Sequence, residues 1–301
     1  MTQKEWLKVF PPRVLFFPGD RSEEINPMSS VLTNTIVSTP DNLPLVVEPG
    51  AIVKWGERNY SLEKEGRYCF MEGHRLVRQV IVYKRDKMAL FRGLAQIQVH
   101  GHRHDGLNFQ EILEVAKKGR VSLTCGSISS FICKLLPLLG IKARMTITLT
   151  MDEWNGYNNG HTMVEYWDSD LERWILLDVD GHCLFKIDDK LLNLLEFCTA
   201  VNQGKNYDVV HLTKLGLYDY GDCLDNGMDQ TCFFDDIFHD GTALKLWHKR
   251  IAQTCGIFFN NKFIFCAEDL GIITRIQSYS EGFYCLPRKE WVKLFYGMGQ
   301  R

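Results

Sequence analysis

The feature of this sequence that most constrains the fold is an apolar helical pattern that begins at a cysteine. Residues 123–136 read LTCGSISSFICKLL. The apolar side chains that follow recur at helical spacing, and they are Ile128, Phe131, Ile132, Leu135, Leu136 and Leu139. This period places them on one face, so the sequence predicts a buried helix from Cys125 to Gly140. Pro137 removes one backbone hydrogen bond and is expected to kink the last turn.

The first turn of that helix is an odd place for an ordinary core thiol. Unpaired backbone N–H groups and the positive end of the helix dipole stabilise a thiolate there, which makes Cys125 a candidate nucleophile. A thiolate needs a general base that can later serve as a general acid, and His161 is the candidate for that role. Cys133, two turns further along the helix, has no such partner and is expected to be core.

A predicted β-hairpin supplies a candidate for the third catalytic residue, a carboxylate that orients His161. After a strand over 141–150, the segments HTMVEYW and ERWILLDVD read as two strands joined by a turn. Pairing Trp167 with Glu172 across a four-residue turn places Asp178 directly opposite His161. Opposed side chains on one face of a sheet are close enough for a carboxylate to orient an imidazole. Asp180 lies diagonally on the same face and is the second choice.

Three stretches of the sequence resemble the transglutaminase-like cysteine enzyme superfamily. They are GRVSLTCGSISSFICKLLPLLGIKAR, GHTMVEYW and RWILLD, which together cover about residues 119–178. The resemblance implies an α+β fold of the papain-like kind, in which the nucleophile-bearing helix packs on an antiparallel β-sheet. It places the nucleophile on Cys125, the base on His161 and the orienting carboxylate on Asp178. Trp174, four residues before that aspartate, is a landmark of the core.

The sequence departs from the family pattern in two places. The Asp-Pro pair that is common after the hairpin tryptophan is here Asp178-Val179. The upstream side chain that usually completes the oxyanion hole is also not evident. The backbone N–H of Cys125 is expected to supply one donor to the oxyanion. Candidates for the second donor are Gln98, Asn108 and Gln110.

The resemblance implies an acyl-transfer reaction. The superfamily includes protein crosslinkers, peptidases, glycopeptide amidases and amide-forming acyltransferases, which share attack of a thiolate on a carbonyl to give a thioester. We expect cleavage of an amide in a protein, peptide or small molecule, without a cofactor. The alternatives are transfer of the acyl group to an amine and a binding module without catalysis. Trp154 and Tyr157, in the loop before His161, are expected to line the substrate site.

Two other motifs could hold a metal. His100, His102 and His104 in the run VHGHRHD would share one face of an extended strand, a geometry that suits a divalent metal and a metal hydrolase. The Asp-His pair that usually follows such a motif is reversed here to His104-Asp105. A solvated turn explains the run equally well. The acidic stretch 219–240 could hold calcium but lacks EF-hand spacing, so a solvated loop is the expected structure.

Composition and charge argue against a nucleic-acid-binding or membrane protein and against a disulfide-rich one. The formal net charge of the 301 residues is -2, which gives no field to attract nucleic acid or an anionic membrane. The N-terminal apolar run is too short for a signal peptide or a membrane span, so we expect a cytoplasmic protein. The ten cysteines are irregularly spaced and include no CxxC pair, which favours free thiols over disulfides or a zinc site.

The expected organisation has three parts. Residues 1–80 form an irregular segment with short strands from residue 46 onward, residues 81–190 form the catalytic core, and residues 191–301 form an α/β extension packed on it. Helices are expected over 85–98 and 108–120, before Cys125. Later elements are predicted to be helices over 191–202 and 242–256 and strands at FIFC and GIITRIQSY.

Overall fold

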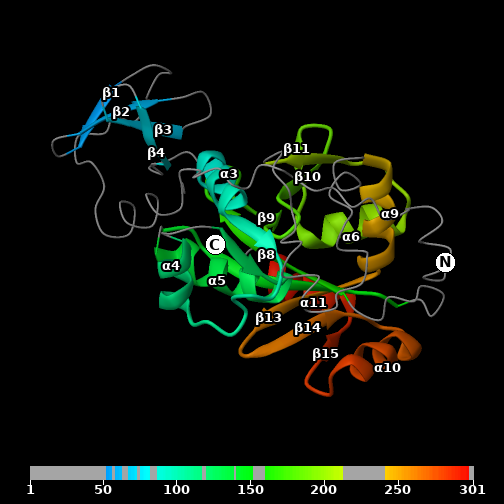
Figure 1. The fold of residues 1–301 in the computed structure, drawn as a ribbon. Helices are drawn as coiled ribbons and strands as arrows, with labels where there is room; N and C mark the ends of the chain where they lie inside the picture. Colours follow the sequence, from blue (N-terminus) through cyan, green and yellow to red (C-terminus); the bar gives the residue numbers. More distant parts are fainter. Residues whose placement is uncertain are drawn as a thin grey trace. The chain divides into compact units, whose positions relative to one another are not determined.

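The protein has an α+β fold, which confirms the expected fold class (Figure 1). The computed structural model describes residues 52–55, 58–62, 67–72, 75–81, 87–116, 120–138, 140–151, 160–212 and 241–297. The described residues divide into two compact units. One contains the described parts of 125–211 and 241–297, and the other contains those of 52–124 together with Leu212. Every helix in the described part of the chain is too short or too polar to span a bilayer.

The unit built from 52–124 contains an antiparallel sheet followed by two helices. The sheet has the order β1-β2-β3-β4, formed by β1 (Ile52–Trp55), β2 (Arg58–Leu62), β3 (Arg67–Glu72) and β4 (Arg75–Ile81). The other elements are α3 (Lys87–Ile97), β5 (Gln98–His100), α4 (Phe109–Ala116) and β6 (Val121–Leu123), and β5 pairs with β6 in parallel. The short strands after residue 46 and the two helices before Cys125 are therefore confirmed.

The other unit is built on a sheet of nine strands. Its order is β11-β10-β9-β8-β7-β13-β14-β15, with β12 paired to β10, and neighbouring strands are antiparallel except for the parallel pair β14–β15. The strands are β7 (Ala143–Leu149), β8 (Gly160–Asp168), β9 (Arg173–Asp178), β10 (Cys183–Ile187), β11 (Lys190–Leu191), β12 (Asp208–His211), β13 (Thr254–Phe259), β14 (Lys262–Cys266) and β15 (Tyr284–Leu286).

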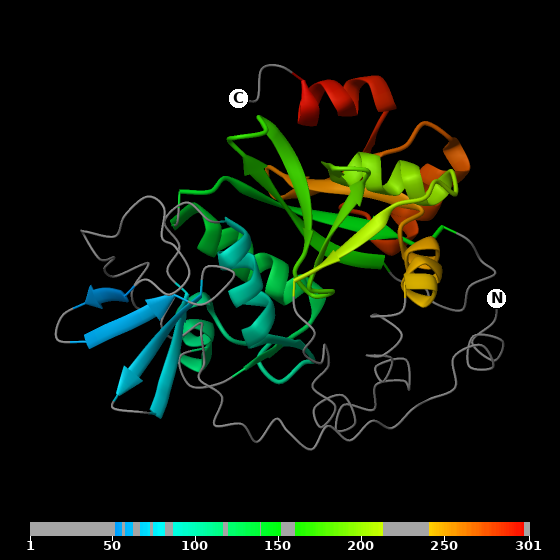
Figure 2. The same ribbon diagram turned by 90° about the horizontal axis from the view of Figure 1, so that it is seen from above.

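The described part of this unit contains five helices. They are α5 (Cys125–Leu138), α6 (Leu194–Asn202), α9 (Gly241–Ile251), α10 (Leu270–Tyr279) and α11 (Arg288–Tyr296). The helix predicted from the cysteine is confirmed as α5, and it packs on β7 and β8. Because β13 pairs with β7, the sheet under α5 continues into strands more than a hundred residues further along the chain (Figure 2).

Strand β7 is buried on the face that carries its threonines. Thr146 and Thr148, the polar residues of its alternating sequence, are both 0% exposed. Thr146 pairs with Met163 of β8 and Ile257 of β13, and Thr148 pairs with Cys255 of β13. Met163, Cys255 and Ile257 belong to an apolar cluster that residues of α6 and α11 complete. The polar face is therefore buried because the C-terminal helices cover it, and the pattern of β7 alone contains no trace of them.

The β8–β9 hairpin forms as predicted, but in a different register. Trp167 pairs with Trp174 and Asp168 with Arg173, so the pairing of Trp167 with Glu172 is wrong by two residues. The Asp168 carboxylate accepts hydrogen bonds from the backbone N–H groups of Asp170 and Leu171, at 3.0 and 3.1 Å. This side-chain cap holds Asp168 at the end of its strand and moves the turn one residue along.

Two C-terminal predictions are wrong. The run GIITRIQSY is helix α10 and not a strand, because Asp269 caps its first turn by accepting a hydrogen bond from the backbone N–H of Ile272 at 3.0 Å. Of this helix only Ile276 is fully buried, whereas a buried strand would bury several residues of the run. The helix predicted over 242–256 ends at Ile251, and β13 begins at Thr254.

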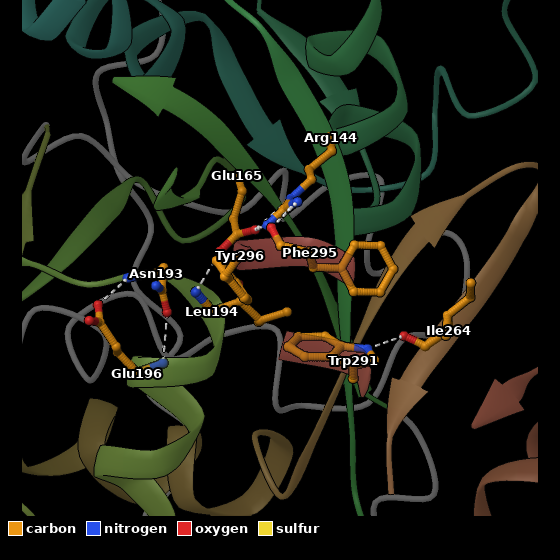
Figure 3. A network of polar contacts seen from close by, with 9 residues as sticks. All are labelled: Arg144, Glu165, Asn193, Leu194, Glu196, Ile264, Trp291, Phe295 and Tyr296. Carbon is orange, nitrogen blue, oxygen red and sulfur yellow. Dashed lines mark hydrogen bonds and ion pairs between the residues drawn. The ribbon is translucent and has the colours of Figure 1, made fainter. Parts of the chain in front are cut away.

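A buried polar network fixes α6 and α11 on the sheet (Figure 3). Glu165 of β8 is 0% exposed and accepts hydrogen bonds from Arg144 Nε at 2.8 Å, from the backbone N–H of Leu194 at 2.7 Å and from the Tyr296 hydroxyl at 2.7 Å. Arg144 also donates to the backbone carbonyl of Phe295 at 3.0 Å. The Arg144–Glu165 pair therefore connects the start of α6 and the end of α11 to the central strands.

Candidate active site

Thr124, the residue directly before Cys125, is fixed by two hydrogen bonds. Strand β6 ends at Leu123, and Thr124 connects it to α5. The Asp105 carboxylate accepts hydrogen bonds from the backbone N–H and the hydroxyl of Thr124, at 2.9 and 3.1 Å. The residue before the candidate nucleophile is thus held by both its backbone and its side chain.

The histidines of the run VHGHRHD form contacts close to Thr124. Strand β5 ends at His100, and residues 101–106 form a turn, so the three histidines do not share one extended strand. His104 Nδ1 accepts a hydrogen bond from the backbone N–H of Ser122 at 2.9 Å, and His102 Nδ1 lies 3.3 Å from the Asp105 carboxylate. Within the described residues these histidines belong to no group of three metal-ligating side chains. The run is a turn that binds the segment before Cys125.

His161 and Asp178 form a buried pair. The Nε2 atom of His161 lies 2.9 and 3.0 Å from the two carboxylate oxygens of Asp178, and the residues are 6% and 2% exposed. By the observed register, Asp178 is opposite Met163 and diagonal to His161 on the same face. The imidazole reaches across this diagonal, so the error in register changed the geometry of the pair without separating it.

The turn after β9 encloses the Asp178 carboxylate. The backbone N–H of Gly181 donates a hydrogen bond to Asp178 Oδ1 at 2.8 Å. A Cβ atom at position 181 would lie 2.5 Å from Asp178 Oδ2, closer than such contacts allow. Only glycine therefore leaves the carboxylate in the place from which it binds the histidine.

Cys125 joins this pair from the helix side. Its Sγ, a ring nitrogen of His161 and a carboxylate oxygen of Asp180 all lie within 4.8 Å of one another. Because Nε2 of His161 is bound to Asp178, Nδ1 is the nitrogen that remains to exchange a proton with Cys125. The structure thus brings together the cysteine, the histidine and both of the carboxylates that the sequence pointed to.

The surroundings of His161 favour its charged form. Burial lowers its pKa, but the charge of Asp178 and the hydrogen bond with it raise the pKa, as do the hydrogen bond with Cys125 and its charge. The net effect is a pKa well above the usual value for histidine. A histidine of this kind keeps its proton at neutral pH.

The sequence did not predict that an aromatic residue of α9 packs against His161. The ring of Trp247, on α9, packs edge-on against His161 with centroids 6.4 Å apart. The next residue, His248, is 1% exposed, and its Nδ1 lies 2.9 Å from the Tyr207 hydroxyl. Burial lowers the pKa of His248 to about 3, so it stays neutral. No spacing in the sequence relates α9 to the hairpin, and only the tertiary fold brings them together.

The other predicted site residues are placed as follows. Trp154 and Tyr157 lie outside the described residues, as does the acidic stretch 219–240. Gln98 is buried in β5, Gln110 is exposed, and the Asn108 side chain accepts backbone hydrogen bonds at the start of α4. The second oxyanion donor therefore remains a prediction.

Several cysteines away from the site are buried thiols with a raised pKa. The seven cysteines whose side chains the structure describes form no disulfide. Burial raises the pKa of Cys133 to about 12, as expected for a core thiol. Burial also raises the pKa of Cys183, which pairs with Asp178 across β9 and β10, and the charge of that aspartate adds to the effect.

A cysteine at a helix start beside a carboxylate-bound histidine is the arrangement of enzymes with a thiol nucleophile. Residues 95–179 match the family model of the transglutaminase-like superfamily. The resemblance stated from the sequence is thereby confirmed. Comparison with curated proteins and with solved structures gives no match. The matched segment contains Cys125, His161 and Asp178 and ends one residue before Asp180.

Proposed function

We propose that this protein is a thiol-dependent enzyme that cleaves an amide through a thioester at Cys125. The superfamily is one of thiol-dependent acyl transfer or hydrolysis. The observation that carries the proposal is the binding of His161 to Asp178 through Nε2, with Cys125 within 4.8 Å of its ring. That arrangement supplies a nucleophile, a proton carrier and an orienting carboxylate.

The proposed reaction has two halves. Cys125 Sγ attacks the carbonyl carbon, the C–N bond breaks, and the imidazolium of His161 gives its proton to the leaving amine. A water molecule then attacks the thioester, His161 removes its proton, and the acid and the thiolate are released. Asp178 holds the ring in one tautomer throughout. The backbone N–H of Cys125 is the proposed first donor to the oxyanion.

Transfer of the acyl group to an amine is the second candidate. The observation that favours it is Asp180, a carboxylate that is 8% exposed and within 4.8 Å of both Cys125 Sγ and the His161 ring. A buried negative charge beside a thioester would attract a cationic amine. Hydrolysis and transfer share the first half of the reaction, so they differ only in what resolves the thioester.

The first test is the pH dependence of alkylation at each of the ten cysteines, followed by peptide mass spectrometry. We expect Cys125 to react fast below about pH 7 and His161→Ala to slow it, because the imidazolium stabilises the thiolate. Cys133 is the matched control on the same helix. A Cys125 that reacts no faster than Cys133, or that ignores the loss of His161, would contradict the enzyme proposal.

A second test separates the two reactions. The protein is incubated with an activated ester of a short carboxylic acid, and the acyl adduct on Cys125 is detected by intact-mass spectrometry. A fluorescent alkylamine is then added. Release of free acid despite excess amine supports hydrolysis, whereas formation of the amide as the main product supports transfer. Cys125→Ser should form no adduct at that position in either case.

A further inference from the structure

The superfamily match accounts for one of the two carboxylates at the site and leaves Asp180 without a role. Asp180 is 8% exposed, lies in the turn between β9 and β10, and falls outside the matched segment. Its carboxylate, Cys125 Sγ and a ring nitrogen of His161 are mutually within 4.8 Å. A thiolate, an imidazole and a carboxylate that converge in this way are three of the ligand types that zinc accepts.

The histidine is held as a metal-ligating histidine is held. In such sites the ring nitrogen that does not bind metal usually donates a hydrogen bond to a carboxylate, which fixes the tautomer and raises the basicity of the other nitrogen. His161 Nε2 makes this bond to Asp178, and the backbone N–H of Gly181 in turn fixes the Asp178 carboxylate. The two carboxylates therefore have separate tasks: Asp178 orients the ring, and Asp180 faces the same space as the thiol.

We propose that Cys125, His161 and Asp180 form a three-ligand site for Zn²⁺, which on binding blocks the nucleophile. Tetrahedral coordination needs ligand atoms about 2.0–2.3 Å from the metal, and the three ligand atoms already converge to within 4.8 Å of one another. A water molecule would take the fourth position. Binding displaces one proton, from the Cys125 thiol or from the His161 imidazolium, and releases it to the buffer.

The metal binding does not depend on the proposed function, but the blocking does. A metal-bound thiolate has its lone pair committed to zinc and cannot attack a carbonyl. The site would therefore convert an ordinary change in free zinc into a reversible loss of thiol reactivity. Zinc should protect Cys125 from alkylation while Cys133, on the same helix, keeps its own slow rate.

The test is a zinc titration of the full chain, freed of metal with a chelator and then exchanged into chelator-free buffer, in competition with a chromogenic zinc indicator. We expect one tight site, at least about tenfold weaker in Asp180→Asn and in Cys125→Ser. Asp189→Asn, in the exposed turn between β10 and β11, is the control and should bind like the parent. With Co²⁺ as the probe, a near-ultraviolet thiolate-to-cobalt absorption should form in the parent and be absent in Cys125→Ser.

Each outcome decides the proposal. Zinc binding that is absent, or equally tight in Asp180→Asn, overturns the three-ligand site. An unchanged thermal unfolding midpoint in the isosteric Asp180→Asn variant separates loss of a ligand from loss of the fold. The alkylation rates without zinc report on the proposed enzyme independently. A Cys125 that is not activated but binds zinc refutes the enzyme and keeps the site, and an activated Cys125 that does not bind zinc does the reverse.

Discussion

Strand β8 carries a buried acid–base pair near each end, and the two pairs differ in what remains unbonded. Toward its end, Glu165 accepts hydrogen bonds from Arg144, from a backbone N–H and from the Tyr296 hydroxyl, so both of its oxygens are bonded. Near its start, His161 uses Nε2 for Asp178 and keeps a second ring nitrogen for Cys125. A saturated pair can only hold the fold together, whereas a pair with a nitrogen left over can move a proton.

The largest effect on stability is expected from breaking the Arg144–Glu165 pair. Glu165→Gln removes the charge opposite Arg144, which is mostly buried, and weakens the bonds to α6 and α11. Loss of one partner of a buried ion pair typically costs about 3–5 kcal/mol. Urea denaturation should therefore show a free energy of unfolding lower by that amount. Asp208→Asn is the control, because its pair with Lys186 is exposed and should cost about 0.5 kcal/mol or less.

The next effect comes from the unsaturated pair. Asp178→Asn keeps the shape but removes the charge that raises the pKa of His161, so this pKa should fall. The rate of Cys125 alkylation near pH 7 should drop about 100-fold, the lower range for loss of acid–base assistance. Imidazole NMR of His161 would follow the titration directly. If the His161 titration midpoint is the same in Asp178→Asn, the carboxylate is not what protonates the ring.

The same pair gives stability a predictable pH dependence. The pKa of His161 is raised in the folded state. Its contribution to the free energy of unfolding is therefore fully present below the pKa of histidine in the unfolded chain, about 6.5, and is lost as the pH rises through the pKa of His161 in the folded protein. The free energy of unfolding should therefore decline toward alkaline pH in the parent and decline less in Asp178→Asn.

A smaller effect should follow from crowding the carboxylate instead of removing its charge. In Gly181→Ala the new methyl group would meet Asp178 Oδ2 at 2.5 Å, so the carboxylate must shift away from His161. We expect Cys125 alkylation to slow by about tenfold, since the pair is distorted and still charged. Gly204→Ala, at a residue with φ of 62° and open space around it, strains the backbone without crowding Asp178 and should leave Cys125 alkylation unchanged.

Sequence could predict the parts of the site that local patterns control. The helix from Cys125 follows from apolar spacing, and the turn length and strand faces of the hairpin follow from alternation, so His161 and Asp178 were placed on the same face. The register depended on the Asp168 side chain capping its own turn, which periodicity does not report. Trp247 and the C-terminal strands reach the site only through long-range pairing of β13 with β7, for which the sequence contains no local signal.

The smallest effect is expected at the second buried histidine, which tests whether burial or charge decides the chemistry. His248 is as buried as His161, but its partner is the neutral Tyr207 hydroxyl, and its pKa is lowered and not raised. Tyr207→Phe leaves a buried ring nitrogen without that hydrogen bond and should lower the free energy of unfolding by about 1 kcal/mol. Because no charge changes, the pH profile of Cys125 alkylation should stay within a factor of about two of the parent. A profile that moves as far as in Asp178→Asn would mean that the two histidines titrate as one system, and the contrast between them would fail.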